Sequence, residues 1–143
     1  MSPLAVLIPH QGGMCLLETV VAHDEQSISL TTTTHRSPDN PLRVAGRLRA
    51  VHLCEYGAQA MAVHGALKAQ AQGSKAPPGM LVALRAVSFA RDYIEDLPGD
   101  LTVTAHCLQA TQSSQQYRFE ISHEGAVIAE GRAAVVLGQN PGA

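Results

Sequence analysis

The sequence predicts an α+β fold in which a curved antiparallel β-sheet wraps around one long central α-helix. The stretch from Ala50 to about Gln72 is apolar around most of the circumference of a helix, so a helix there needs cover on most sides. Segments with the alternating pattern of β-strands precede and follow it, and few layered arrangements cover such a helix. A chain of 143 residues suffices for one domain, so we treat 1–143 as a single domain.

Two strands are expected before the helix, at 18–24 and 27–34. The second contains ISLTTTT, in which apolar and hydroxyl-bearing residues alternate and β-branched residues dominate. His23, Asp24 and Glu25 mark the turn between the two strands, so the pair is predicted to form a hairpin. The segment RSPDNPLRVAG then contains two prolines and leads into the helix as a loop.

Four strands are expected after the helix, which SKAPPG at 74–79 prevents from continuing. They are predicted at 80–93, 101–110, 114–124 and 127–137. The apolar pattern of the first strand shifts phase in the middle, which indicates a bulge, and its buried members are expected to include Val82, Leu84, Ala86, Val87 and Phe89. Such a sheet leaves a long edge strand, so we expect two units to pair edge to edge as a dimer.

Composition and charge exclude several classes of protein. The formal net charge is -2 and the 10 Lys and Arg residues are scattered, so neither a nucleic acid nor a membrane surface is an expected partner. Three cysteines without CxxC spacing, and a beginning unlike a signal peptide, indicate a reducing compartment and a cytoplasmic location. No residues have zinc-like spacing and no glycine-rich loop has phosphate-binding spacing, so neither a metal nor another cofactor is expected.

Glu55 is the first candidate for chemistry. It is the only carboxylate in the predicted helix, and a carboxylate in an apolar helix loses hydration worth several kcal/mol unless it is paired or neutralised. His52 lies three residues before it and Gln59 four residues after it, so all three share one face of the helix. The pattern fits either a reactive carboxyl group or a core glutamate satisfied by its neighbours.

Four stretches carry a resemblance to a known family. The sequence resembles the hotdog-fold 3-hydroxyacyl-acyl-carrier-protein dehydratases, most of all the branch found in aryl-polyene and related lipid pathways. The resemblance lies in Ile8-Pro9-His10 with Met14 to Glu18, in the loop residues His35, Pro38, Pro41 and Gly46, in EYGAQAM at 55–61, and in LPGDL at 97–101. These stretches span most of the chain, so the resemblance implies the hotdog fold for the whole of it.

The resemblance also implies roles for individual residues. His35 corresponds to the base that removes the proton beside the carbonyl, and Glu55 to the acid that protonates the departing hydroxyl. Gly46 is the residue expected to let the thioester approach backbone N–H groups that form an oxyanion site. Gln59 is expected at the substrate site or bound to Glu55 or a backbone group. His35 lies twenty residues before Glu55, a longer loop than in better-known members, so His10 stays a competing candidate in the same cleft.

Three functions remain open from the sequence. The first is a dehydratase acting on chains bound to acyl carrier protein, as a homodimer or as a heterodimer with another hotdog subunit. The second is an acyl thioesterase, and the third is a partner subunit with a degenerate site of its own. Arginines near the loop could meet an acidic carrier protein: Arg36, Arg43, Arg47 and Arg49. The remaining histidines are expected to be ordinary surface or strand residues, namely His64, His106 and His123, with His52 beside Glu55 or at an interface.

Overall fold

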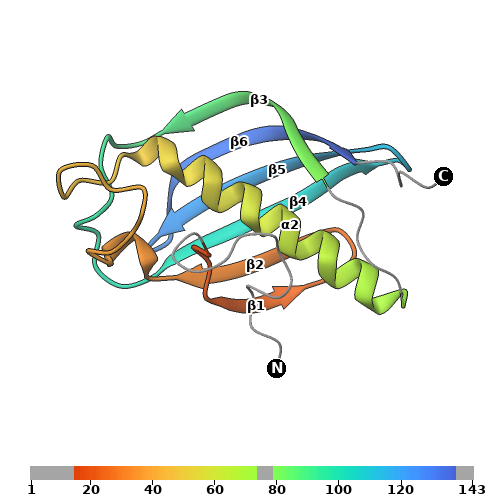
Figure 1. The fold of residues 1–143 in the computed structure, drawn as a ribbon, viewed down its shortest axis with the longest axis horizontal. Coiled ribbons are helices and arrows are strands. Elements are labelled where there is room, and N and C mark those ends of the chain that lie inside the picture. Colours follow the sequence, from red (N-terminus) through yellow and green to blue (C-terminus); the bar gives the residue numbers. More distant parts are fainter. Residues whose placement is uncertain (1–14, 74–78, 138–143) are drawn as a thin grey trace.

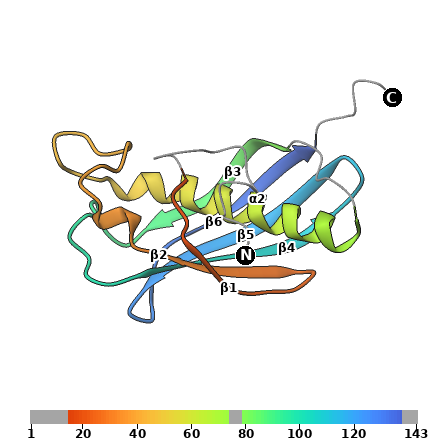
Figure 2. The same ribbon diagram turned by 60° about the horizontal axis from the view of Figure 1, so that its bottom comes forward.

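The computed structural model describes residues 15–73 and 79–137. They form one antiparallel sheet of six strands and one long helix that lies across a face of that sheet (Figures 1 and 2). The strands follow the order β1-β2-β4-β5-β6-β3. Their bounds are β1 Thr19–His23, β2 Ser27–Thr32, β3 Gly79–Phe89, β4 Leu101–Ala110, β5 Ser114–His123 and β6 Ala126–Leu137. The helix, α2, spans Leu53–Ala71 and follows a 3-10 turn, η3, at Ala50–His52.

This architecture is the predicted hotdog arrangement. The expected hairpin is formed by β1 and β2, and four further strands follow the helix. A second 3-10 turn, η2, spans Thr34–Arg36 directly after β2 and begins the proline-containing loop. The loop therefore leaves the sheet close to the N-terminal end of α2 (Figure 1).

The hydrophobic core lies between α2 and the middle of the sheet. On β5, Tyr117, Phe119 and Ile121 are fully buried because alternate residues of a strand face the same side. On α2, Tyr56 and Val63 are also fully buried, among residues spaced three or four apart along the helix. The same face of β5 was predicted from the sequence, so the core is confirmed at this strand.

Phe119 lies between α2 and the sheet, beside two glycines. In the sheet it is paired with Gly131 of β6 and Ala105 of β4, two residues too small to crowd its ring. A Cβ added to Gly57 of α2 would lie only 2.7 Å from Cδ2 of Phe119, and one added to Gly131 would lie 2.9 Å from Cζ. The two glycines therefore leave the space that the phenyl ring fills.

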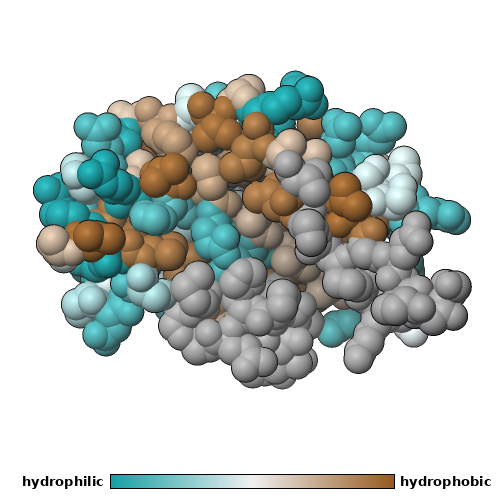
Figure 3. All heavy atoms as spheres, turned by 45° about the horizontal axis from the view of Figure 1, so that its top comes forward, coloured by the Kyte–Doolittle hydropathy of each residue, from teal (hydrophilic) through white to brown (hydrophobic). Residues whose placement is uncertain are grey.

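Strand β3 departs from the prediction. Leu84, which was expected to be buried, is 40% exposed, and Ala86 is also exposed. Val87 and Phe89 are half-buried, and the side chain of Val82 lies outside the described part. The reason is position: β3 is the last strand of the sheet, whereas α2 packs on β2, β4 and β5. Apolar side chains consequently remain visible on the face seen in Figure 3.

The irregularity predicted for β3 is confirmed. Its pairing with β6 shifts register between Leu81 and Ala83 and again between Arg85 and Ser88. Ala86 lies inside the second shift and has a φ of 53°, a conformation that an alanine adopts only under strain.

The described residues also include no helix with the length and apolar character needed to cross a membrane.

Candidate active site

Glu55 lies in the first turn of α2. Its carboxyl group therefore lies near the unpaired backbone N–H groups of the helix start. The side chain is half-buried, whereas the apolar pattern around it predicted a more enclosed carboxylate. The difference arises because the sheet covers one face of α2 and Glu55 lies outside the row of fully buried residues that face it.

Gln59 lies one turn further along α2 and is fully buried. Its Oε1 accepts a hydrogen bond of 2.9 Å from the backbone N–H of Leu16. This contact fixes the orientation of the amide, so Nε2 is the atom that donates to Oε1 of Glu55, over 3.3 Å. Gln59 thus binds both Glu55 and a backbone group, the two contacts that the sequence had left as alternatives.

His35 is fully buried in the η2 turn. Its Nε2 lies 2.9 Å from the carbonyl oxygen of Leu97, which only accepts, so Nε2 carries the proton. Burial lowers the pKa of His35, the bond to Leu97 opposes that shift, and nearby Arg36 lowers the pKa further. The ring is therefore neutral at pH 7, with Nδ1 unprotonated, and Nδ1 has no hydrogen-bond partner among the described residues.

The structure brings Glu55 and Gln59 together but does not join His35 to Glu55 directly. In residues 15–73 and 79–137 no hydrogen bond links those two side chains. His35 instead fastens the η2 turn to the LPGD turn that precedes β4. His10 lies outside the described residues.

Gly46 lies in a tight turn seven residues before α2. Val44 and Arg47 close this turn, and Ala45 and Gly46 have φ values of 53° and 77°. A Cβ added to Gly46 would meet nothing within 4 Å, and the residue is exposed. The backbone conformation of the turn therefore accounts for the glycine in this chain, and its role at an oxyanion site stays a prediction.

His64 contradicts the prediction that it is an ordinary surface or strand residue. It lies on α2 and is fully buried, with Nε2 2.8 Å from the carbonyl oxygen of Asp24 and Nδ1 2.7 Å from the hydroxyl of Tyr117. The carbonyl only accepts, so Nε2 holds the proton and Tyr117 donates to Nδ1. The sequence could not reveal this pair, because Tyr117 is 53 residues away along the chain.

This buried pair predicts a pH-dependent stability. Burial lowers the pKa of His64 below 6.5, as does Lys68, while Asp24 opposes the shift. Because the unfolded chain then binds the proton more tightly, the contribution of His64 is complete above pH 6.5 and is lost as the pH falls through the lower folded value. We expect the thermal unfolding temperature to drop between pH 7.5 and pH 5, and to drop less in His64→Gln.

The comparison with His64→Gln is needed because the pKa of His35 is lowered too, and His35 adds a dependence of the same sign. The variant keeps that second contribution and removes only the first. Equal pH dependence in the two proteins would show that His64 does not titrate on unfolding.

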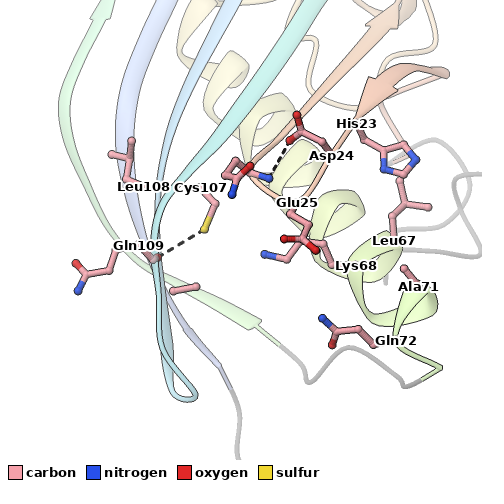
Figure 4. A pocket seen from close by; sticks show the side chains of 12 residues that line it. His23, Asp24, Glu25, Leu67, Lys68, Ala71, Gln72, Cys107, Leu108 and Gln109 are labelled. Carbon is pink, nitrogen blue, oxygen red and sulfur yellow. Dashed lines mark hydrogen bonds between the residues drawn. The ribbon is translucent and has the colours of Figure 1, made fainter.

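A cavity lies at the other end of α2. Its volume is about 660 Å³, and it is lined by the C-terminal end of α2, the β1–β2 turn and the end of β4 (Figure 4). Lys68, which lines it, is thirteen residues after Glu55, a separation of about 20 Å along a helix. None of the candidate residues His35, Gly46, Glu55 and Gln59 lines this cavity, so it is separate from the candidate active site.

Comparisons with known proteins place the chain among hotdog proteins. A family model described as ApeP-like, ApeP dehydratase, matches residues 2–142. Among solved structures, the dehydratase heterocomplex ApeI:P from Xenorhabdus doucetiae superposes with a TM-score of 0.88 at 23% identity, over 98% of this chain and 93% of that chain. No curated protein sequence shows significant similarity.

More distant structural relatives have other descriptions. A hypothetical thioesterase with coenzyme A from Streptococcus pneumoniae has a TM-score of 0.61 at 10% identity, over 85% of both chains. The PaaI protein of the phenylacetic acid degradation operon of E. coli has a TM-score of 0.60 at 18% identity, over 82% of this chain and 81% of that chain. These similarities show the shared fold.

Proposed function

Because this chain belongs to the ApeP-like dehydratase family, we propose that it removes water from 3-hydroxyacyl chains carried by acyl carrier protein, in aryl-polyene-type lipid biosynthesis. The observation that carries the proposal is the carboxyl group of Glu55, half-buried at the start of α2 and bound by the side chain of Gln59. An acid at this place can give a proton to the departing hydroxyl.

The contact with Gln59 supports a fixed orientation of the Glu55 carboxyl group, because Gln59 donates to its Oε1. The protonated carboxyl group gives its proton to the hydroxyl as the carbon–oxygen bond of the substrate breaks, and the departing group becomes water. The base takes the proton from the carbon beside the carbonyl, which leaves the double bond.

Two histidines are candidates for the base. Nδ1 of His35 is unprotonated and could accept a proton, but the side chain is 0% exposed, so a substrate reaches it only after the residues that cover the ring move. This burial weighs toward a structural role for His35 and favours His10, which the sequence places in the segment that resembles the opening of the family. We expect His10→Ala to lose activity at unchanged stability, and His35→Ala to lower the unfolding temperature.

The assay is the intact mass of a 3-hydroxyacyl acyl carrier protein after incubation with the purified chain. Wild-type protein is expected to remove one water, and thermal unfolding of each variant is measured in parallel. Loss of activity in His35→Ala with unchanged unfolding would assign the base to His35. Full activity in both variants would show that neither histidine is the base. An unchanged mass with folded wild-type protein would show that the chain does not act as a dehydratase by itself.

A partner subunit is part of the proposal. The long strand β3 is an edge strand of the sheet within the described part. Its Leu81 and Leu84 are both 40% exposed. We propose that a second hotdog subunit pairs there, either a copy of this chain or a different one, as the name of the ApeI:P heterocomplex states for that protein. If activity appears only after a different hotdog subunit is added, the chain is the partner in a heterodimer.

The proposed carrier protein fits the charges beside the loop. Arg36 and Arg49 are exposed, and Arg47 is partly engaged by Glu95 at 2.6 Å and lies over the ring of Tyr93 at 3.8 Å. These cations offer contacts to the acidic surface of a carrier or to the phosphate of its phosphopantetheine arm. The thioesterase alternative is tested in the same assay, since a hydrolase releases a free thiol and a dehydratase does not.

A further inference from the structure

The geometry points to Tyr56 as a positioning residue that, together with Thr34 and Asn40, holds the Leu16 peptide against Gln59 and thereby orients Glu55. The inference rests on the proposed function, because it concerns the orientation of the proposed acid. Tyr56 follows Glu55 directly on α2, yet it turns into the core, where it is fully buried. It does not reach the substrate, so any effect it has on catalysis passes through other residues.

The first arm of the network runs from Asn40 through Tyr56 to Thr34. Asn40 Nδ2 donates to the hydroxyl of Tyr56 over 3.1 Å and to the carbonyl of Thr34 over 2.9 Å. The backbone N–H of Leu42 donates to Oδ1 of Asn40 over 2.9 Å, which fixes the orientation of the amide. The Tyr56 hydroxyl also lies 2.9 Å from Oγ1 of Thr34.

The direction of each hydrogen bond follows from groups that only donate or only accept. Asn40 Nδ2 only donates, so the hydroxyl of Tyr56 accepts from it. The carbonyl of Leu16 only accepts, so Thr34 gives its one hydroxyl proton to Leu16 and accepts the proton of Tyr56. Burial raises the pKa of Tyr56, so this proton is retained. Thr34 in turn donates to the carbonyl oxygen of Leu16 over 2.6 Å. The arm is therefore a directed chain from Asn40 to the Leu16 carbonyl.

The second arm of the network starts at the backbone N–H of Leu16. The N–H of Leu16 donates to Oε1 of Gln59, and Nε2 of Gln59 donates to Oε1 of Glu55. Leu16 is fully buried, and its N–H is held by Gln59 of α2. Its carbonyl accepts from Thr34, which Tyr56 of α2 holds in turn, and also from the hydroxyl of Thr32 in β2. A shift of Leu16 would carry the Gln59 amide with it and change the orientation of Glu55.

The network also reaches His35, one of the two candidate bases. Thr34 directly precedes His35, so its bonds to Tyr56 and Leu16 hold the η2 turn in place. The positioning role concerns the orientation of Glu55, so it does not depend on which histidine takes the proton.

Tyr56→Phe is the variant that tests the inference, because it keeps the ring and removes only the hydroxyl. Small displacements of a catalytic group cost up to about 100-fold in rate, so we expect kcat to fall by about 10- to 100-fold. KM for the carrier-bound substrate is expected to change by less than about threefold, since Tyr56 makes no substrate contact. Both constants are measured with the water-elimination assay.

Tyr117→Phe is the matched control. Tyr117 is the other fully buried tyrosine, and it also loses a hydrogen bond, to His64, when its hydroxyl is removed. Tyr117 lies outside the network, so this variant is expected to lose stability and keep its kcat. Equal effects of the two variants on kcat would show that Tyr56 acts only through general stability and would overturn the positioning role.

Variants of Thr34 extend the test along the same chain of bonds. Thr34→Val interrupts the chain and is expected to lower kcat as Tyr56→Phe does, whereas Thr34→Ser keeps the hydroxyl and is expected to retain kcat. The double variant Tyr56→Phe with Thr34→Val should lose no more than the worse single variant, because the chain is already broken. Multiplied losses would contradict a single network, while inactive wild-type protein would instead contradict the proposed function.

Discussion

Replacing Glu55 with Gln is expected to slow water elimination by about 100- to 10,000-fold, the usual contribution of a positioned general acid. The amide has nearly the same shape as the carboxyl group and can still accept a hydrogen bond from Gln59. It carries no proton that it can transfer to a departing hydroxyl. The measurement is the fraction of 3-hydroxyacyl carrier protein that loses one water per unit time, with intact mass as the readout.

Glu130→Gln is the matched control for this prediction. Glu130 is exposed on β6, outside the candidate site. Its substitution by Gln removes the same ionisable group as Glu55→Gln does. It is expected to match the wild-type rate, and both variants are expected to unfold near the wild-type temperature. A Glu55→Gln protein that is folded and fully active would remove Glu55 from the chemistry.

Replacing Phe119 with Ala is expected to lower the free energy of unfolding by about 3–5 kcal/mol, the range for large cavities in a packed core. The ring is fully buried and lies between the helix at Gly57 and the sheet at Gly131. Neither neighbour has a side chain that could move into the space, so the cavity would persist. Denaturant-induced unfolding, followed by circular dichroism, measures the change.

The control for this loss of packing is Val127→Ala. Val127 is 44% exposed on β6, and substitutions at such sites usually change stability by less than about 0.5 kcal/mol. A loss below about 1 kcal/mol in Phe119→Ala would mean that α2 and the sheet close over the vacated space. Such a result would contradict the inference that Gly57 and Gly131 leave the space that the phenyl ring fills.

The sequence predicted the elements that have a clear period. The apolar stretch after Arg49 gave the helix, and the alternation of Tyr117, Phe119 and Ile121 gave the buried face of β5. The same reasoning was wrong for the exposure of β3, because a period shows that a strand has an apolar face and does not show what covers it. Leu84 is apolar and exposed because β3 is at the edge of the sheet.

The candidate site was predicted only as far as local spacing reaches. Glu55 and Gln59 are one helical turn apart, so their contact could be foreseen. The contacts of His64 with Tyr117, of His35 with Leu97 and of Tyr56 with Thr34 join residues 53, 62 and 22 positions apart. Such contacts depend on strand order and loop path, which residue periodicity does not contain.

The two edges of the sheet differ in a way that limits how many chains can join. Within residues 15–73 and 79–137, one edge is β3, with eleven residues, and the other is β1, with five residues and an interruption between Val20 and Ala22. Each chain therefore has one edge suited to pairing, in effect a valence of one. Units of valence one close in pairs and cannot grow into rings or fibres, so we expect assemblies of two subunits even at high concentration.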